Sequence, residues 1–291
     1  MNNKPLIIYH RNCPDGITAA WVVWRHFNGN ADLQSANYGE QAAEQAPDPT
    51  DREVYIVDFS YSRMELAAMA MYAKKLVVLD HHKTAQANLV GLEEELNKLG
   101  RDVTIMFDME RSGARLAWDY CNPCKDFDPP IIVEYCEDRD LWRWNLPASR
   151  EINAAIGSYK FDVQTWDRLS KQTWEDLRVE GEAILRYQNR EIEEMLGISF
   201  IGEVAGYKVP ILNCNVKSLT PEACNRLARD YPFSVAWYMN EKGEYSYSFR
   251  SVMGEKNPIG VDVSEITKQF GGGGHSCAAG CISKLPLFKK V

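Results

Sequence analysis

The stretch "VVLDHHKTA" (77–85) places three polar groups, Asp80, His81 and His82, directly after a run of apolar residues. Carboxylate and imidazole side chains bind metal ions and transfer protons. A buried strand followed by a solvated loop would produce the same pattern. The rest of the chain is therefore needed to distinguish a metal site from an ordinary strand end.

Short apolar runs alternate with helix-periodic segments through the first half of the chain. The runs lie at 6–9, 54–57, 76–79 and 103–107, and the helical patterns lie at 16–27, at 62–75 and after Ser112. Ser62 and Glu65 have the spacing of a capping box, and Ser112 is a candidate N-cap. Almost continuous apolar strands between helices predict a parallel sheet that is covered on both faces.

The sequence changes character near residue 150. Residues 173–197 form a long, charged, helix-periodic segment, which we expect to link two domains. The sequence predicts strands at 208–214, 233–239 and 244–251, and a helical pattern at 261–270 leads into a run of glycines. We predict an α/β protein with an N-terminal parallel-sheet domain (1–172), a linker helix (173–197) and a smaller C-terminal α/β domain with a mixed sheet (198–291).

Composition narrows the class of protein. Hydrophobic residues make up 45% of the 291 positions and charged residues 25%, which is typical of soluble globular proteins. The net charge of −8 and the pI near 5.3 argue against binding to long duplex nucleic acid. With no apolar run of about 20 residues and no export signal, we expect a cytoplasmic protein that has reduced cysteines and does not enter a membrane. The CxxC pair of Cys121 and Cys124 lacks the second pair that a zinc site needs.

Polar groups follow three of the apolar runs. His10 follows the first run, Asp58 follows the second, and Asp80, His81 and His82 follow the third. The carboxyl ends of parallel strands meet at one edge of a sheet, so these groups should converge there. Imidazole with carboxylate favours Mn²⁺, Fe²⁺ or Zn²⁺, and a pair of such ions suits phosphoryl chemistry.

Six segments in order give the chain a recognisable pattern. They are "HRNCPDGITAA" (10–20), "IVDFS" (56–60), "VLDHHKTA" (78–85), "EDRDLW" (137–142), "SFRS" (248–251) and "FGGGGHSCAAG" (270–280). With these segments the chain resembles the DHH phosphoesterase superfamily, in the branch with a C-terminal DHHA1 domain, over nearly its whole length. That superfamily includes RecJ-type exonucleases, family II pyrophosphatases, oligoribonucleases and phosphodiesterases of cyclic dinucleotides. The resemblance implies a DHH metal-binding catalytic domain in 1–172 and a DHHA1 substrate-binding domain in 198–291.

The resemblance also implies a centre of two metal ions, usually Mn²⁺, with Mg²⁺, Co²⁺ or Fe²⁺ as possible substitutes. Asp58 would bridge the ions, His81 would bind the second ion, and His82 would lie beside the substrate phosphate. Asp80 would be either a ligand or a residue that orients a histidine. The implied metal ligands are His10, Asp15, Asp58, Asp80, His81 and Asp138, and the implied catalytic residues are His82 and Asp80.

Two positions in these motifs are ambiguous. Asp138 and Asp140 both precede Trp142, and the spacing to this aromatic residue favours Asp138 as the ligand. The first motif of the family carries two aspartates, whereas only Asp15 is present here. Either Asn12 or Cys13 fills the gap, or one metal ion is held more weakly. Cys13 is then either a thiolate ligand or a neutral thiol packed in the loop.

The glycine run of the second domain has two interpretations. It is either a flexible turn or a segment whose backbone N–H groups approach an anion. The guanidinium of Arg250 and the imidazole of His275 would then add donors to a phosphate. The resemblance implies the second interpretation, in which the substrate-binding residues are Arg250, Gly272, Gly273, Gly274 and His275.

These features predict a metal-dependent phosphodiesterase that hydrolyses short oligonucleotides or cyclic or linear dinucleotides with a water molecule activated by two metal ions. A homodimer is compatible with these features. Alternatives are a pAp-type phosphomonoesterase and a pyro- or polyphosphatase, although the DHHA1-type loop argues against a pure pyrophosphatase. The incomplete first motif leaves a non-enzymatic alternative, a nucleotide-binding sensor with a decayed metal site, which a manganese-dependent turnover assay would distinguish.

Overall fold

The computed structural model describes residues 3–38, 47–124, 127–255 and 257–290. The chain divides into two compact units, Met1–Leu185 and Arg186–Val291, and the division falls inside the long helix α10 (Trp174–Gly197). This helix contains nearly all of the segment that the sequence assigns to the linker. Among the described residues, every helix is too short or too polar to cross a lipid bilayer.

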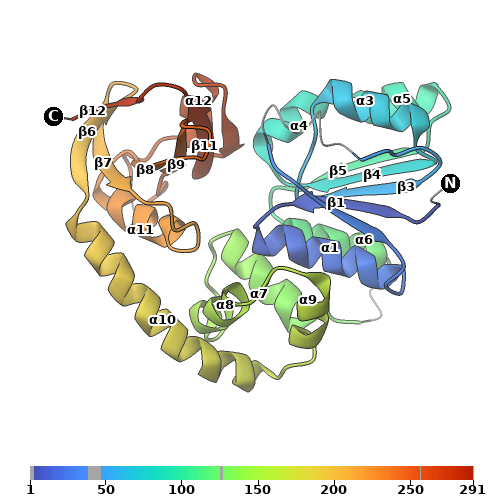
Figure 1. Ribbon diagram of the computed structural model, residues 1–291, viewed down its shortest axis with the longest axis horizontal. Coiled ribbons are helices and arrows are strands. Elements are labelled where there is room, and N and C mark those ends of the chain that lie inside the picture. Colours follow the sequence, from blue (N-terminus) through green and yellow to red (C-terminus); the bar gives the residue numbers. More distant parts are fainter. Residues whose placement is uncertain (1–2, 39–46, 125–126, 256, 291) are drawn as a thin grey trace. The chain divides into compact units, whose positions relative to one another are not determined.

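The first unit is built on a sheet of five parallel strands in the order β2-β1-β3-β4-β5 (Figure 1). The strands are β1 (Leu6–His10), β2 (Asp32–Ala36), β3 (Glu53–Val57), β4 (Lys75–Asp80) and β5 (Val103–Phe107). The four strands predicted from apolar runs are all present. Strand β2 was not predicted, because its sequence, DLQSA, has no apolar run and it lies at the edge of the sheet.

Helices cover both faces of this sheet, as Figure 1 shows. One face carries α3 (Arg63–Tyr72), α4 (Lys83–Leu89) and α5 (Leu92–Lys98), and the other carries α1 (Pro14–His26) and α6 (Gly113–Cys121). Successive strand residues point to opposite faces, so Ile8 packs with the first group of helices and Ile7 with the second. Beyond α1 and α6 lie α7 (Ile131–Asp140), α8 (Ser149–Ser158) and α9 (Val163–Leu169). The predicted α/β fold is confirmed.

The predicted helix starts are also confirmed. Ser62 and Glu65 form a capping box at the start of α3, in which each side chain bonds the backbone N–H of the other residue. Ser112 caps α6 by accepting a hydrogen bond from Arg115 N at 3.2 Å. Both serines satisfy N–H groups that a first helical turn leaves without partners.

The second unit contains a seven-stranded mixed sheet in the order β10-β11-β9-β8-β7-β6-β12, in which only the β7–β8 pair is parallel. The strands are β6 (Phe200–Val204), β7 (Tyr207–Asn213), β8 (Ser234–Met239), β9 (Tyr245–Arg250), β10 (Gly273–His275), β11 (Ala278–Ser283) and β12 (Phe288–Lys290). This mixed sheet and the β8–β9 hairpin agree with the sequence-based expectation.

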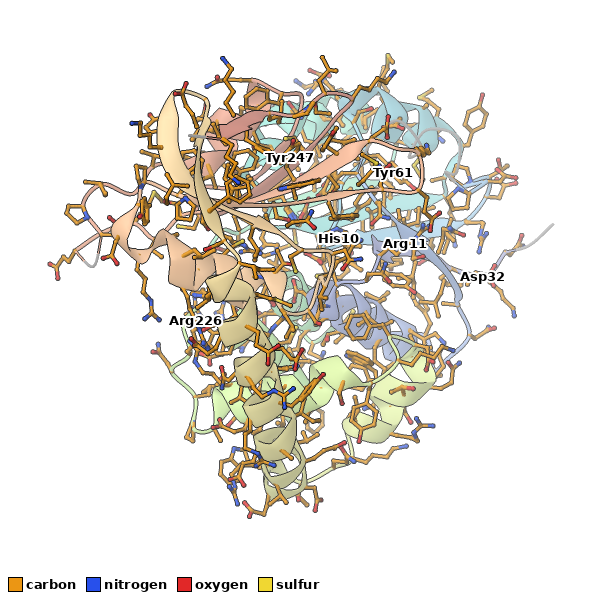
Figure 2. The ribbon with its side chains drawn as sticks, turned by 60° about the vertical axis from the view of Figure 1, so that its left-hand side comes forward. His10, Arg11, Asp32, Tyr61, Arg226 and Tyr247 are labelled. Atoms are coloured by element: carbon orange, nitrogen blue, oxygen red, sulfur yellow. The ribbon has the colours of Figure 1, made fainter. Side chains whose placement is uncertain are left out.

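Two helices pack on opposite faces of the second sheet. Helix α11 (Thr220–Leu227) and the last turns of α10 cover Leu212 and Ala236, whereas α12 (Val263–Lys268) covers Val235 and Phe249. Arg226, labelled in Figure 2, joins α11 to α10 through Glu193 at 2.8 Å and Asn189 at 2.5 Å. The sheet and its two helices therefore form a core that is separate from that of the first unit.

Candidate metal centre

The side chains that follow the apolar runs meet at one edge of the first sheet. His10 ends β1, Asp58 directly follows β3, and Asp80 ends β4. These three strands are neighbours in the order β1-β3-β4, and the backbone N–H of Asp58 donates to Leu79 O at 2.9 Å. Figure 2 labels His10 together with Arg11, whose guanidinium reaches across to β2 at Ser35. The convergence expected from parallel strands is therefore present.

Three carboxylates surround the imidazole of His81. Its Nε2 lies 3.2 Å from Asp58 Oδ1, 3.4 Å from Asp140 Oδ2 and 3.6 Å from Asp15 Oδ2. Burial disfavours the charged form of His81, but Asp58, Asp140 and Asp15 outweigh it and raise its pKa to about 10. Burial, followed by the charges of Asp58 and Asp140, also raises the pKa of Asp15 well above its usual range. The cluster thus holds more carboxylate than one histidine can balance, which is the electrostatic condition for binding a cation.

Asp58 belongs to two groups of candidate ligands. The ligand atoms of Asp15, Asp58 and His81 all lie within 4.8 Å of one another, and so do those of His10, Asp58 and His82. On the second side, His10 Nδ1 lies 3.5 Å from Asp58 Oδ2. Both atoms are buried and make no hydrogen bond within the described part of the chain. Buried polar atoms of this kind need an explanation, and a bound ion provides one.

The backbone of Asp58 adopts a left-handed conformation, with a φ of 52°. Aspartate adopts this conformation more readily than most residues with a side chain. Burial of Asp58 would raise the pKa of its carboxyl group, but the His10 and His81 imidazoles lower this pKa well below its usual range. Asp58 is therefore an ionised carboxylate, held between two histidines.

Asp80 is engaged in orienting His82. Its Oδ2 accepts a hydrogen bond from Ser60 Oγ at 2.6 Å, and its Oδ1 lies 2.7 Å from His82 Nδ1. Oδ1 also accepts the backbone N–H of His81 at 2.8 Å. With both oxygens engaged, the geometry favours the orienting role of Asp80 over the role of ligand. Ser60 was not singled out in the sequence, although it ends the quoted segment "IVDFS".

The structure differs from the sequence-based preference between Asp138 and Asp140. Asp138 points away from the cluster: it accepts hydrogen bonds from Ser149 Oγ at 2.5 Å, Asn145 N at 2.9 Å and Leu146 N at 3.3 Å. Asp140 is the residue that faces His81. Residues two positions apart in a helix point in directions roughly 200° apart, so α7 can present only one of the two aspartates to the cluster.

Asp15 is held in place by the start of α6. Its Oδ2 accepts Gly113 N at 2.5 Å, and its Oδ1 accepts Ala114 N at 2.9 Å and Cys136 Sγ at 3.4 Å. None of these three residues was identified from the sequence. They lie 98, 99 and 121 positions from Asp15 along the chain, so no local sequence pattern connects them to it.

Neither residue proposed to fill the gap in the first motif joins the two ligand groups. Asn12 has a φ of 55°, a left-handed conformation that asparagine tolerates well. Cys13 is the N-cap residue of α1. Burial and the charges of Asp58, Asp140 and Asp15 raise the pKa of the Cys13 thiol well above its usual range. The raised pKa favours a neutral thiol at Cys13 over a thiolate.

In the second unit, two of the predicted substrate-binding residues lie in one row of the sheet. Arg250 pairs with Ala278, and Ala278 pairs with His275 on the next strand. Directly opposite residues in antiparallel strands present their side chains on the same face. Arg250 and His275 therefore flank the small side chain of Ala278.

The glycine run is part of this sheet. Gly273 and Gly274 belong to β10, and a Cβ on Gly274 would lie 2.5 Å from Ala278 O. A Cβ on Gly272 would likewise overlap Cys281, at 2.6 Å from its Cβ. Close packing against β11 thus explains why positions 272 and 274 are glycines. The role of this glycine run in anion binding stays a prediction.

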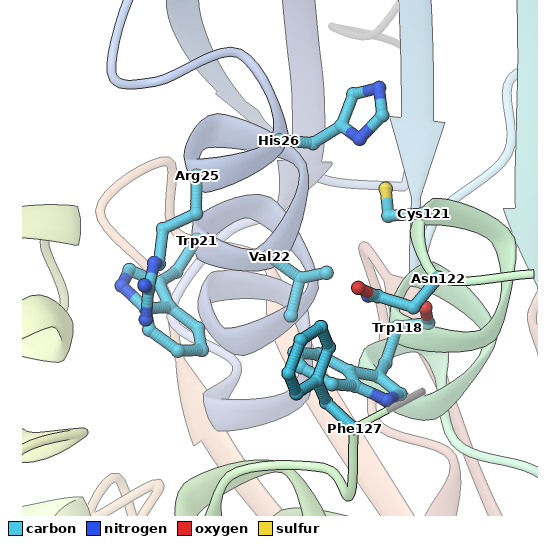
Figure 3. Close-up of a pocket in the computed structure, with 8 residues that line it drawn as sticks. All are labelled: Trp21, Val22, Arg25, His26, Trp118, Cys121, Asn122 and Phe127. Atoms are coloured by element: carbon cyan, nitrogen blue, oxygen red, sulfur yellow. The ribbon is translucent and has the colours of Figure 1, made fainter. Parts of the chain in front are cut away.

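A pocket with a volume of about 300 Å³ opens elsewhere in the first unit (Figure 3). It lies between α1 and α6, and no candidate metal ligand lines it. The lining residues are Trp21, Val22, Arg25, His26, Trp118, Cys121, Asn122 and Phe127.

Comparisons with known proteins show which fold this is. No model of a known protein family matches the sequence. Two solved structures are similar: a DHH domain from a member of a family of ribosomal proteins (TM-score 0.54, 15% identity, 96% of this chain and 82% of that one) and RecJ of Thermus thermophilus in complex with Mn²⁺ (TM-score 0.51, 15% identity, 97% and 50%). The chain has the DHH fold. The resemblance found in the motifs is confirmed.

Two proteins are similar to this chain in sequence. An uncharacterized protein of Acanthamoeba polyphaga mimivirus is 30% identical over 294 residues, which cover 94% of this chain and 66% of the relative. The oligoribonuclease NrnB of Bacillus subtilis is 26% identical over 227 residues, covering 71% of this chain and 52% of the relative. The chain thus spans just under two thirds of the first relative's length and about half of the second's.

Proposed function

We propose that this DHH chain is a metal-dependent phosphodiesterase that hydrolyses short nucleotide substrates. The main support for the proposal is that two groups of candidate ligands share Asp58. A carboxylate shared in this way could bind two adjacent cations, and a pair of cations suits phosphoryl chemistry. The oligoribonuclease activity of the relative NrnB is consistent with the nature of the substrate. The acidic chain, with a net charge of −8, also suits small substrates better than long nucleic acids.

The residues present fit a pair of divalent cations. Their donors are imidazole nitrogens and carboxylate oxygens, which suit Mn²⁺ and Fe²⁺, and Mn²⁺ is the ion in the similar RecJ structure. We propose His10, Asp15, Asp58, His81 and Asp140 as the ligands, with Asp140 in place of Asp138. When bound, the ions would supply Lewis acidity that activates water and neutralises charge on the phosphate.

His82 would contribute a hydrogen-bond donor to the substrate phosphate. Asp80 fixes its ring through Nδ1, and Ser60 in turn holds Asp80. Burial opposes the charged form of His82, but the carboxylate of Asp80 outweighs it and raises the pKa of His82 above its usual value. A protonated His82 would stabilise the negative charge that develops on the phosphate oxygens during attack. Arg250 and His275 of the second unit would bind another phosphate or the terminus of the substrate.

A panel of substrates tests the proposed function. We would incubate the protein with Mn²⁺ and 5′-phosphorylated oligonucleotides of two to ten units, cyclic dinucleotides or pAp, and separate the products by chromatography. We expect Mn²⁺-dependent cleavage of a short oligonucleotide or a dinucleotide. Release of phosphate from pAp alone would indicate a phosphomonoesterase. Binding of nucleotides without any turnover would indicate a sensor.

The two aspartates of α7 should respond differently to substitution. Asp140→Asn should lower the amount of bound Mn²⁺ with little change in melting temperature, because its carboxylate faces His81. Asp138→Ala should instead destabilise the protein by about 2 kcal/mol or more, because the buried Ser149 Oγ and the backbone N–H groups of Asn145 and Leu146 lose their acceptor. Metal analysis and thermal unfolding of both variants check this. Loss of Mn²⁺ from a well-folded Asp138 variant, but not from Asp140→Asn, would restore the original preference.

Arg250→Ala and His275→Ala should lower kcat/KM for short oligonucleotides but leave Mn²⁺ binding unchanged. Each substitution removes a charge-assisted hydrogen bond, which corresponds to about 1.5–3 kcal/mol, or roughly 10- to 150-fold in kcat/KM. Bis-p-nitrophenyl phosphate lacks a second anchoring group, so its hydrolysis should change much less. Wild-type kcat/KM on oligonucleotides in both variants would show that this row of the sheet does not bind substrate.

A further inference from the structure

The first residue of α6, Gly113, has no room for a side chain. A Cβ at this position would lie 2.6 Å from the Cβ of Asp58, 2.9 Å from the Cα of Asp58 and 2.9 Å from Oδ2 of Asp15. Real Cβ atoms are essentially never found below 3.0 Å from such atoms. The two crowded residues belong to one group of candidate metal ligands, together with His81.

The same turn of α6 also binds Asp15 directly. The N–H groups of Gly113 and Ala114 donate to the two oxygens of the Asp15 carboxylate, at 2.5 and 2.9 Å. These N–H groups have no partner within their own helix, since they lie in its first turn. The start of α6 therefore both orients Asp15 and lies against Asp58.

The packing of helix α6 opposes a shift that would make room for a larger residue at position 113. Ala114 and Ala117 are fully buried in the core that α6 shares with α1, and Leu116 is nearly so. The cap residue Ser112 is also fully buried. Interiors packed in this way transmit a displacement to their neighbours. An added side chain would therefore have to displace Asp58 and Asp15.

We propose that Gly113 is a positioning residue for the metal centre. The absence of its side chain lets the first turn of α6 hold Asp15 and contact Asp58 at the same time, which keeps the ligand atoms of the two carboxylates within 4.8 Å of each other. This inference rests on the proposed function, because it assumes that the cluster binds metal.

The test is the affinity for Mn²⁺ of Gly113→Ala, measured by calorimetric titration and accompanied by a melting temperature. We expect the Kd to rise roughly 10- to 100-fold, as for other residues that orient metal ligands. Gly157→Ala is the matched control, because Gly157 is also helical and a Cβ there meets nothing within 4 Å. It should leave both the Kd and the fold unchanged.

A second control separates positioning from general loosening. A Cβ at Gly181 of α10 would overlap the backbone oxygen of Glu151, in the same unit but away from the cluster. Gly181→Ala should lower the melting temperature and leave the Kd for Mn²⁺ of the folded protein unchanged. An equal rise in Kd for Gly113→Ala and Gly181→Ala would overturn the inference, and so would an unchanged Kd in Gly113→Ala.

The remaining outcomes are also distinguishable. If the wild-type protein does not bind Mn²⁺, the proposed metal centre itself fails. If Gly113→Ala does not fold, Ser112→Ala provides the test, because loss of its cap to Arg115 N loosens the turn that holds Asp15. We expect its Kd to rise about 10-fold, and a wild-type Kd would overturn the inference.

Discussion

Asp58→Ala is expected to abolish turnover and to lower the Mn²⁺ content of the protein while leaving the fold intact. Asp58 is the residue that both ligand groups share, so its loss weakens both proposed ion sites together. Bound metal ions stabilise the charge of the transition state by several kcal/mol, so weaker binding of both ions should lower the rate by at least about 100-fold. Metal analysis, circular dichroism and the oligonucleotide assay together measure the three expectations.

Two further variants sharpen this test. Asp58→Asn keeps the shape of the side chain and, like aspartate, tolerates the left-handed φ of 52°, so any loss of metal comes from the missing charge. Asp102→Ala is the control, because Asp102 is exposed and immediately precedes β5, at the opposite end of the sheet. Full metal occupancy and unchanged activity in Asp58→Ala would contradict a centre of two metal ions.

His81→Ala and His82→Ala are both expected to abolish turnover, but for different reasons. His81 lies among three carboxylates, so its loss should lower the metal content. His82 is oriented by Asp80 and is proposed to face the substrate, so its variant should keep the metal and lose the rate. We expect losses of at least about 100-fold in kcat for His82→Ala.

Metal content measured on the two single variants distinguishes these roles. The structure places His82 near enough to His10 and Asp58 to act as a metal ligand. The measurement therefore decides whether His82 binds a metal ion or faces the substrate. Equal loss of metal from both variants would assign His82 to the metal centre. Ser60→Ala is a milder companion variant, which should lower kcat but keep the metal, because Ser60 acts on His82 only through Asp80.

The main elements of the fold could be read from local sequence patterns. The runs at 6–9, 54–57, 76–79 and 103–107 became four adjacent strands, because continuous apolar segments are stable only when both faces of a sheet are covered. Strand β2 was not predicted, because this edge strand has the sequence DLQSA and contains no apolar run. In the second sheet, strands β7, β8 and β9 were predicted, whereas β6, β10, β11 and β12 were not.

Part of the candidate site could be read in the same way. His10, Asp58 and Asp80 were expected to converge, because parallel strands end at one edge, and the structure places them there. Their roles, and those of Asp15 and His81, stay proposals. At Asp138 and Asp140 the geometry favours a different choice: their spacing to Trp142 suggested Asp138, whereas the rotation of α7 turns Asp140 toward His81. Which of the two binds a metal ion stays a prediction.

The sequence by itself determined which chemical groups stand at the ends of the strands, since the strand pattern and the residue after each strand are properties of neighbouring positions. The tertiary structure alone decided which carboxylate of α7 faces the cluster, and that the start of α6 holds Asp15. Gly113 and Asp15 are 98 positions apart, and their contact exists only because α6 packs against α1. Contacts of this kind depend on how helices rotate and pack, which no local pattern encodes.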